Sequence, residues 1–193
     1  MSGENLHWYL KEDVNEQWAW CASFTPEECN QIVEIGNSLT KVEGSINDSE
    51  VDSNRRKSKV SWIPVNPDTA WIFARCTDMI NAINDQYFKF DLSYIESLQF
   101  TTYESPGDFY TRHVDIGYKG GGTRKLSFSI QLSSPESYEG SQLVLHIGVK
   151  PVEAPAQQGV ATLFPSYSLH EVTPITSGTR YSLVGWVIGP KFK

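Results

Sequence analysis

His113 and Asp115 stand two residues apart in a segment of aromatic and β-branched side chains. On a β-strand this spacing points both side chains to one face, so that an imidazole nitrogen and a carboxylate oxygen could bind one metal ion. A third suitable residue, His170, stands near the start of a later strand-like segment. Two histidines and one carboxylate can hold Fe(II) on one face and leave other positions open. The same ligands would accept zinc or manganese, because affinity alone does not select iron.

Arg180 follows His170 by ten positions, and we expect it on the adjacent strand. A guanidinium group suits two-pronged recognition of a carboxylate. Beside an open metal site it would hold the far end of a dicarboxylate that chelates the metal at its other end. The alternative for an isolated arginine is a surface ion pair, which contributes little to stability.

Together these residues make the chain resemble the prolyl-4-hydroxylase-like branch of the 2-oxoglutarate/Fe(II) oxygenases, over roughly residues 96–190. The matching segments are Tyr103-Glu104-Ser105-Pro106-Gly107, residues 109–115, residues 138–143, Leu163-Phe164-Pro165, residues 170–174, Thr179-Arg180-Tyr181 and Trp186. The resemblance implies that His113, Asp115 and His170 bind the iron. It also implies that Arg180 binds the distal carboxylate of 2-oxoglutarate.

Two aromatic residues extend the resemblance. Tyr103 resembles a family tyrosine that lines the co-substrate pocket, and Trp186 an aromatic near the site; either could equally be a packed core residue. The sequence departs from the family on the strand after the His-x-Asp loop, where related hydroxylases often carry a tyrosine that helps to hold the distal carboxylate. Ser129 or Thr162 is the expected substitute, since that strand carries Ser127, Ser129 and Gln131.

The resemblance implies a dioxygenase that hydroxylates its substrate and releases succinate and CO2. Its cofactor would be Fe(II) and its co-substrate 2-oxoglutarate, with ascorbate as an optional addition. Asp115 favours hydroxylation, because halogenating relatives lack this carboxylate. The expected partner is a peptide or protein containing proline, although the same motif would serve a free amino acid or another small molecule. A non-catalytic jelly-roll binding module is the alternative of another class, and the intact set of four residues argues against it.

Composition sets wider limits. The chain has 193 residues, 39% of them hydrophobic, which suffices for one domain with a sizeable core. A net charge of −7 argues against nucleic acid as a partner. We expect no membrane span, because no run approaches the roughly 18 apolar residues required. The polar amino terminus and three cysteines, Cys21, Cys29 and Cys76, favour a cytoplasmic protein with free thiols.

Local patterns predict an α+β double-stranded β-helix, or jelly roll, mostly antiparallel, with two N-terminal helices packed on one sheet. Thr25-Pro26-Glu27-Glu28 is a capping-box start for a helix to about Leu39, and a second helix follows Asn66-Pro67. The predicted strands are 96–103, 109–115, 125–132, 142–147, 159–164, 170–175 and 180–188.

We therefore expect one oxygenase domain over 1–193, with helical support in 1–93 and a jelly-roll catalytic core in 94–190. Residues 44–59 are predicted to be a mobile loop that carries Arg55, Arg56, Lys57 and Lys59. Such a loop is either a solvated segment or a lid over an acidic or extended substrate. Two further histidines are not expected to bind metal: His7 on the surface and His146 as a hydrogen-bonded or exposed side chain.

Overall fold

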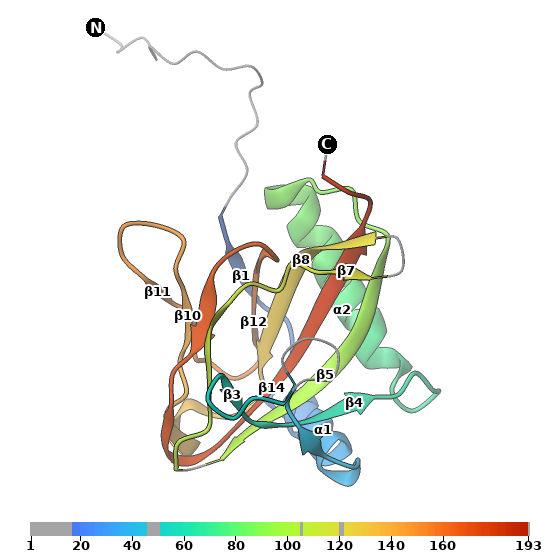
Figure 1. The fold of residues 1–193 in the computed structure, drawn as a ribbon. Helices are drawn as coiled ribbons and strands as arrows, with labels where there is room; N and C mark the ends of the chain where they lie inside the picture. The colour runs from blue at the N-terminus through green and yellow to red at the C-terminus, as the bar shows by residue number, and fades with distance from the viewer. Residues whose placement is uncertain (1–16, 46–50, 105, 120–121, 193) are drawn as a thin grey trace, which may run out of the picture.

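The computed structural model describes residues 17–45, 51–104, 106–119 and 122–192 (Figure 1). Its first elements are β1 (Ala19–Ala22), α1 (Pro26–Ser38), β2 (Val42–Glu43), β3 (Arg56–Lys57), β4 (Lys59–Ile63) and α2 (Ala70–Ile83), which a π-helical turn at Asn84–Phe88 extends. The later strands are β5 (Tyr94–Glu104), β6 (Phe109–His113), β7 (Tyr118–Lys119), β8 (Gly122–Gln131), β9 (Tyr138–Gly140), β10 (Leu143–Leu145), β11 (Val152–Glu153), β12 (Val160–Pro165), β13 (His170–Val172) and β14 (Ile175–Gly189), with a 3-10 turn at Pro135–Ser137.

The described strands form two antiparallel sheets. The larger has the order β1–β12–β8–β14–β5–β4–β2, with β7 beside β8 and β9 beside β14. The smaller has the order β11–β10–β13–β6–β3. All pairs among these strands run antiparallel, which confirms the mostly antiparallel class.

The expected N-terminal helical block is wrong. Helices occupy 26–38 and 70–88, but β1 precedes them and β2, β3 and β4 lie between them. These strands belong to the same sheets as the C-terminal ones, because β1 pairs with β12 and β4 pairs with β5. These strands were not predicted because, at two to five residues, they are too short to show a clear alternation of polar and apolar side chains.

The prediction that residues 44–59 form a mobile loop is also partly wrong. Residues 46–50 lie outside the described residues, and for them the loop stays a prediction. Further along, however, Arg56 pairs with Tyr110 and Lys57 with Phe109 in the β3–β6 ladder, and β4 begins at Lys59. The basic end of this segment therefore belongs to the sheets, and its strand β3 pairs with β6, which carries His113.

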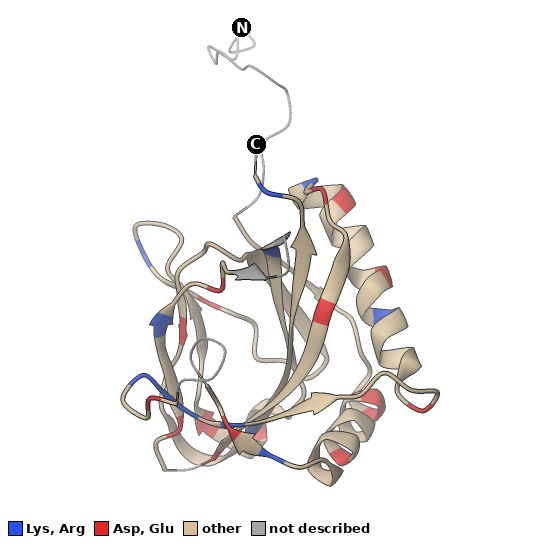
Figure 2. Ribbon diagram, turned by 45° about the vertical axis from the view of Figure 1, so that its right-hand side comes forward, with Lys and Arg blue, Asp and Glu red and all other residues tan. Residues whose placement is uncertain are grey.

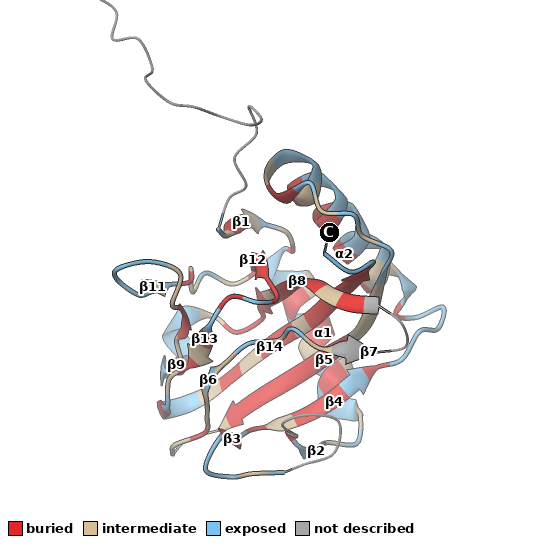
Figure 3. Cartoon of the chain, turned by 45° about the horizontal axis from the view of Figure 1, so that its top comes forward, coloured by how far each residue is buried: buried red, intermediate tan, exposed pale blue. Residues whose placement is uncertain are grey.

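The central strands of the larger sheet are largely buried (Figure 3), and their side chains alternate between two chemically different faces. One face packs against both helices, and its buried residues include Leu98, Phe100, Phe128, Ile130 and Leu183, in one core with Ile32, Ile72, Cys76 and Ile80. The residues between them point the other way and line a cavity: Gln99, Thr101 and Tyr103 on β5, Ser129 on β8, and Arg180, Ser182 and Trp186 on β14. The helices thus fix one face of the sheet and leave the polar face for a site.

Helix starts follow the local sequence. Thr25 accepts a hydrogen bond from the Glu28 amide, and the Glu28 carboxylate accepts one from the Thr25 amide, so the predicted capping box forms. The second helix begins at Ala70 because Asn66 first closes a turn, accepting from the amides of Asp68 and Thr69. Acidic residues on the outer faces of both helices contribute to the negative net charge (Figure 2).

Candidate metal and co-substrate site

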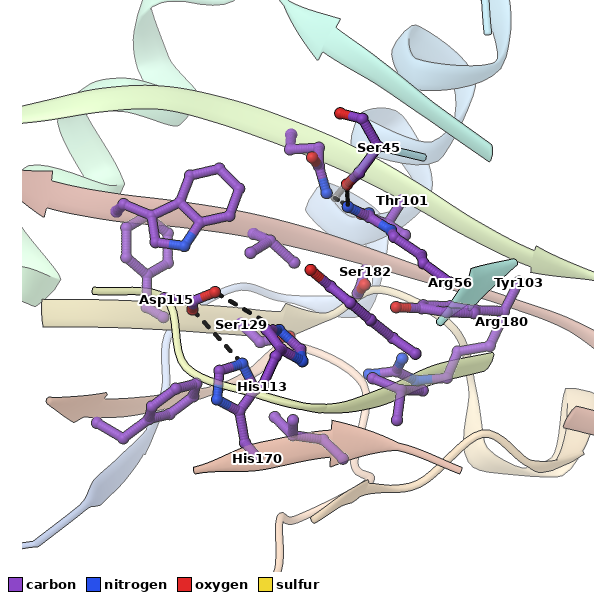
Figure 4. Close-up of a pocket in the computed structure, with 18 of the residues that line it drawn as sticks. Ser45, Arg56, Thr101, Tyr103, His113, Asp115, Ser129, His170, Arg180 and Ser182 are labelled. Atoms are coloured by element: carbon purple, nitrogen blue, oxygen red, sulfur yellow. Dashed lines mark hydrogen bonds and ion pairs between the residues drawn. The ribbon is translucent and has the colours of Figure 1, made fainter. Parts of the chain in front are cut away.

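His113, Asp115 and His170 converge in the cavity between the two sheets (Figure 4). His113 on β6 and His170 on β13 are direct partners across the strand pair, so their side chains share one face. Nε2 of each imidazole lies 3.5 Å from an Asp115 carboxylate oxygen, and the three donor atoms fall within 4.8 Å of one another. This is the geometry of a small-ion site.

Asp115 lies beyond the strand on which it was expected, because β6 ends at His113. Its position comes instead from the turn before β13: the amides of Asp115 and Ile116 both donate to the Ser166 carbonyl at 2.8 Å. The Ser166 hydroxyl is also hydrogen-bonded to Ser127 at 2.9 Å. Backbone contacts between the two sheets thus hold the carboxylate opposite the imidazoles.

Backbone carbonyls fix the orientation of both imidazoles. His113 Nδ1 lies 2.7 Å from the Thr111 carbonyl, and His170 Nδ1 lies 2.9 Å from the Ser168 carbonyl. Because a carbonyl only accepts, each Nδ1 donates a hydrogen bond, and each Nε2 is the nitrogen that faces the centre. The two rings are therefore oriented with Nε2 toward a bound ion.

The electrostatics of the site agree with this arrangement. Burial alone would raise the pKa of Asp115, but His170, His113 and Ser127 outweigh it and hold the pKa well below its usual range. Burial lowers the pKa of His170 despite the nearby carboxylate. A carboxylate and a neutral imidazole are the forms that bind a cation.

Arg180 lies in the same cavity but on the opposite sheet. The expectation of a strand adjacent to that of His170 is wrong: β14 belongs to the larger sheet and pairs with β5 and β8. The chain crosses over at Thr173-Pro174, where proline cannot donate to a sheet ladder. Arg180 is only 4% exposed, and its guanidinium carbon lies 5.6 Å from the centre of the Tyr103 ring.

Tyr103 lines the cavity beside Arg180, and the two are cross-strand partners. Burial raises the pKa of its hydroxyl, which stays protonated as a donor. Ser129 also lines this end, together with Ser182, whereas Thr162 lines only a smaller adjoining space that Arg180 also borders. Ser129 is thus the better placed of the two expected hydroxyls.

Aromatic side chains enclose the other end of this cavity of about 180 Å³. The rings of Trp62 and Trp186 lie 6.3 Å apart, and the Arg124 guanidinium covers Trp186 at 4.2 Å. Arg124 is itself held by two hydrogen bonds to Glu96, at 2.7 and 2.8 Å. Trp186 is therefore both packed and part of the cavity wall.

Two contributors were not predicted from the sequence. Gln131, noted for its place on β8, accepts a hydrogen bond from Arg180 Nε at 2.9 Å. Arg56, expected in a mobile loop, is buried and lines the cavity. His146 is a hydrogen-bonded side chain as predicted, 2.8 Å from a Glu171 oxygen, and His7 lies outside the described residues.

Comparison with known proteins gives the site a context. Residues 98–188 match the 2OG-Fe(II) oxygenase superfamily. A PKHD-type hydroxylase of Hyphomonas neptunium (strain ATCC 15444) is 40% identical over 85 residues, which are 42% of this chain and 38% of that protein. The chain thus covers about two fifths of the length of the curated relatives that it matches, such as this one.

Solved structures extend the likeness over most of the chain. A Pseudomonas putida prolyl-4-hydroxylase superposes with a TM-score of 0.68 at 25% identity, covering 89% of this chain and 92% of that one. A Trichoplax adhaerens prolyl hydroxylase, solved with a peptide fragment of the hypoxia inducible factor oxygen degradation domain, gives 0.75 at 19% identity, covering 90% and 84%. In the described part of the chain, both helices are too short or too polar to cross a bilayer.

Proposed function

We propose that the chain belongs to the 2OG-Fe(II) oxygenase superfamily and is a 2-oxoglutarate- and O2-dependent hydroxylase acting on a prolyl residue in a peptide or protein. One observation carries the proposal: the three metal-binding donors open into the same cavity as the buried guanidinium of Arg180. We also infer that the two sheets form a double-stranded β-helix within a single domain.

The donor set fits Fe(II). His113 and His170 offer two imidazole nitrogens, and Asp115 offers one ionised oxygen. Such a set binds one face of the ion and leaves the remaining positions for other ligands. The hydrogen bonds from each Nδ1 to a carbonyl orient the rings before any ion arrives, which reduces the cost of binding.

Arg180 supplies the matching partner for 2-oxoglutarate. Gln131 accepts a hydrogen bond from Arg180 Nε, so the terminal nitrogens of the guanidinium stay available for the distal carboxylate. Ser129 and Tyr103 line the same cavity, and their hydroxyls would add hydrogen bonds from its wall. When bound, iron and 2-oxoglutarate supply the oxidising chemistry, consuming O2 and releasing succinate and CO2.

The shape of the cavity supports a prolyl substrate. Trp62 and Trp186 form an aromatic wall at the end away from Arg180, suited to a small apolar ring such as pyrrolidine. Trp62 is 47% exposed, so this wall extends to the surface, where a longer chain could enter. A peptide is thus favoured over a free amino acid, which would need less open access.

An anaerobic titration tests the proposal. The protein is loaded with Fe(II), 2-oxoglutarate is added, and the visible metal-to-ligand charge-transfer band is recorded for wild type, His113→Ala and Arg180→Ala. We expect a band in wild type, none in His113→Ala and a weaker one in Arg180→Ala. Proline-containing peptides are then screened by succinate release and by a mass gain of one oxygen. Folded wild type without band or bound metal would favour a binding module instead.

A further inference from the structure

Arg56 is a buried cation to which the proposed reaction assigns no role. It lies on β3, is 7% exposed and lines the same cavity as His113 and Arg180 (Figure 4). Its guanidinium carbon lies 4.7 Å from the centre of the Tyr110 ring. The Tyr110 ring also stacks on the His113 imidazole, and the ring centres lie 3.6 Å apart. One aromatic ring thus separates Arg56 from a proposed metal ligand.

The partners of Arg56 are neutral. Its Nε donates to the Ser58 hydroxyl and its Nη1 to the Ser45 carbonyl, both at 2.9 Å. Among the described residues, Nη2 makes no hydrogen bond and no carboxylate lies within 4.0 Å of the guanidinium. The two lysines nearest in sequence, by contrast, have acidic partners: Lys57 pairs with Asp108 and Lys59 with Glu104.

A buried guanidinium without a counter-ion is costly. The Tyr110 ring and two neutral acceptors offset part of that cost and fix the side chain in place. What remains is an oriented charge in the cavity lining, to which a carboxylate could be added. The site is therefore prepared for an anionic group that enters from outside.

The other charges of the cavity already have roles. Arg124 is neutralised by Glu96 through two hydrogen bonds. Asp115 belongs to the proposed metal site, and Arg180 to the proposed co-substrate site. Because the described residues leave no carboxylate for Arg56, we look for one on the molecule to be hydroxylated.

We propose that Arg56 binds a carboxylate group of the substrate close to the carbon that is hydroxylated, an inference that rests on the proposed function. Two sources share this chemistry: an aspartate or glutamate side chain next to the target residue, and a terminal carboxylate on the target residue itself. The substrate class is therefore acidic at or beside the reacting residue.

Matched pairs of proline compounds separate these sources. The side-chain arm compares blocked peptides with Asp or Asn on either side of proline. The terminal arm compares a peptide ending in proline as free acid or amide, and free proline with its amide. For each compound, KM and kcat are taken from succinate release, and affinity from the change that it causes in the visible band without O2. Proteins are wild type, Arg56→Gln, Arg56→Lys and Arg55→Gln, the last a matched control because Arg55 is exposed.

We expect wild type to prefer the acidic member of one arm by about tenfold or more, mainly through KM, as for a hydrogen bond between charged groups. Arg56→Gln should remove the preference, Arg56→Lys should restore part of it, and Arg55→Gln should keep it. The arm that shows the preference identifies the source.

Equal affinity for the acidic and neutral members in wild type, or a preference that survives in Arg56→Gln, would overturn the inference. So would an unchanged preference accompanied by weaker 2-oxoglutarate binding in Arg56→Gln, which would assign Arg56 to the co-substrate. If acidic compounds bind through Arg56 but no proline is hydroxylated, the prolyl proposal fails and the inference stands. Should Arg56→Gln fail to fold, the absence of a preference in wild type would still overturn the inference, and an undiminished preference in Arg56→Lys would also count against it.

Discussion

Arg180 donates from Nε to the side-chain oxygen of Gln131 at 2.9 Å, and both residues are buried. The amide nitrogen of Gln131 in turn donates to the Tyr138 hydroxyl at 3.0 Å and to the Ser133 carbonyl at 3.2 Å. The bond to the Ser133 carbonyl settles which end of the amide faces Arg180, since a carbonyl accepts only from the amide nitrogen and leaves the amide oxygen to accept from Nε. Gln131 is therefore a positioning residue that holds the guanidinium toward the cavity.

Replacing Gln131 tests that role. Gln131→Leu removes the acceptor but nearly keeps the volume, so Arg180 keeps its charge and loses its orientation. We expect the dissociation constant of 2-oxoglutarate to rise about tenfold, the loss expected for a hydrogen bond to a charged group. In Gln131→Glu the new carboxylate would pair with Arg180 and weaken binding further. The charge-transfer band, titrated anaerobically with 2-oxoglutarate, measures both.

The matching control is the thermal unfolding midpoint, because Gln131 also contacts β9 through Tyr138. A variant that unfolds at the wild-type temperature and still binds 2-oxoglutarate with wild-type affinity would show that Arg180 needs no such support.

The residues of the candidate site were predictable because their chemistry depends on type and spacing. His113 and Asp115 stand two apart, and His170 and Arg180 ten apart, in segments that alternate like strands. The structure brings all four into one cavity. The sheet that carries Arg180 was not predictable, because the change of sheet at Thr173-Pro174 depends on pairing between distant strands.

Arg56 and Gln131 show where prediction from sequence ends. Arg56 stands in a polar, charged run that is typical of a loop, and only its pairing with Tyr110 turns it inward. Gln131 is one of several polar residues on β8, and its task appears only when Arg180 arrives from β14. Both roles arise from contacts between strands, which local patterns do not encode.

Gly185 on β14 faces the core beneath the helices at a point where there is no room for a side chain. A side-chain carbon there would lie 2.3 Å from Phe128 Cζ and 3.1 Å from Leu98 Cδ2, within the core beneath the helices. We expect Gly185→Ala to lower the free energy of unfolding by about 1–3 kcal/mol through overpacking. Urea denaturation followed by circular dichroism measures the change.

Gly148→Ala is the control, because the nearest atom to an added carbon there is the Lys150 carbonyl oxygen at 4.0 Å. Its unfolding should match wild type closely. Equal stability of the two variants would mean that Phe128 can move aside at little cost, contrary to a tightly packed core.

The three cysteines are free thiols, and their burial predicts how they react. Burial raises the pKa of Cys76 to about 12 and that of Cys29 to about 11, and it raises the pKa of the half-buried Cys21 as well. Since the thiolate is the reactive form, alkylation at pH 8 should label Cys21 first. Cys29 and Cys76 should react only when the protein opens. Mass spectrometry of adducts over time gives the order.

The same shifts set a pH dependence of stability. Because the pKa of these thiols is higher in the folded than in the unfolded chain, their contribution is complete below about pH 8.5, the usual thiol pKa. It declines as the pH rises from there toward 11 and 12, since the unfolded thiols ionise while the folded Cys29 and Cys76 stay protonated. Replacing both cysteines with alanine should flatten this alkaline decline in urea unfolding measured between pH 8 and 10.5. An equally steep decline in the double variant would assign it to other groups, of which the hydroxyls of buried Tyr103 and partly buried Tyr110 have their pKa raised in the same direction.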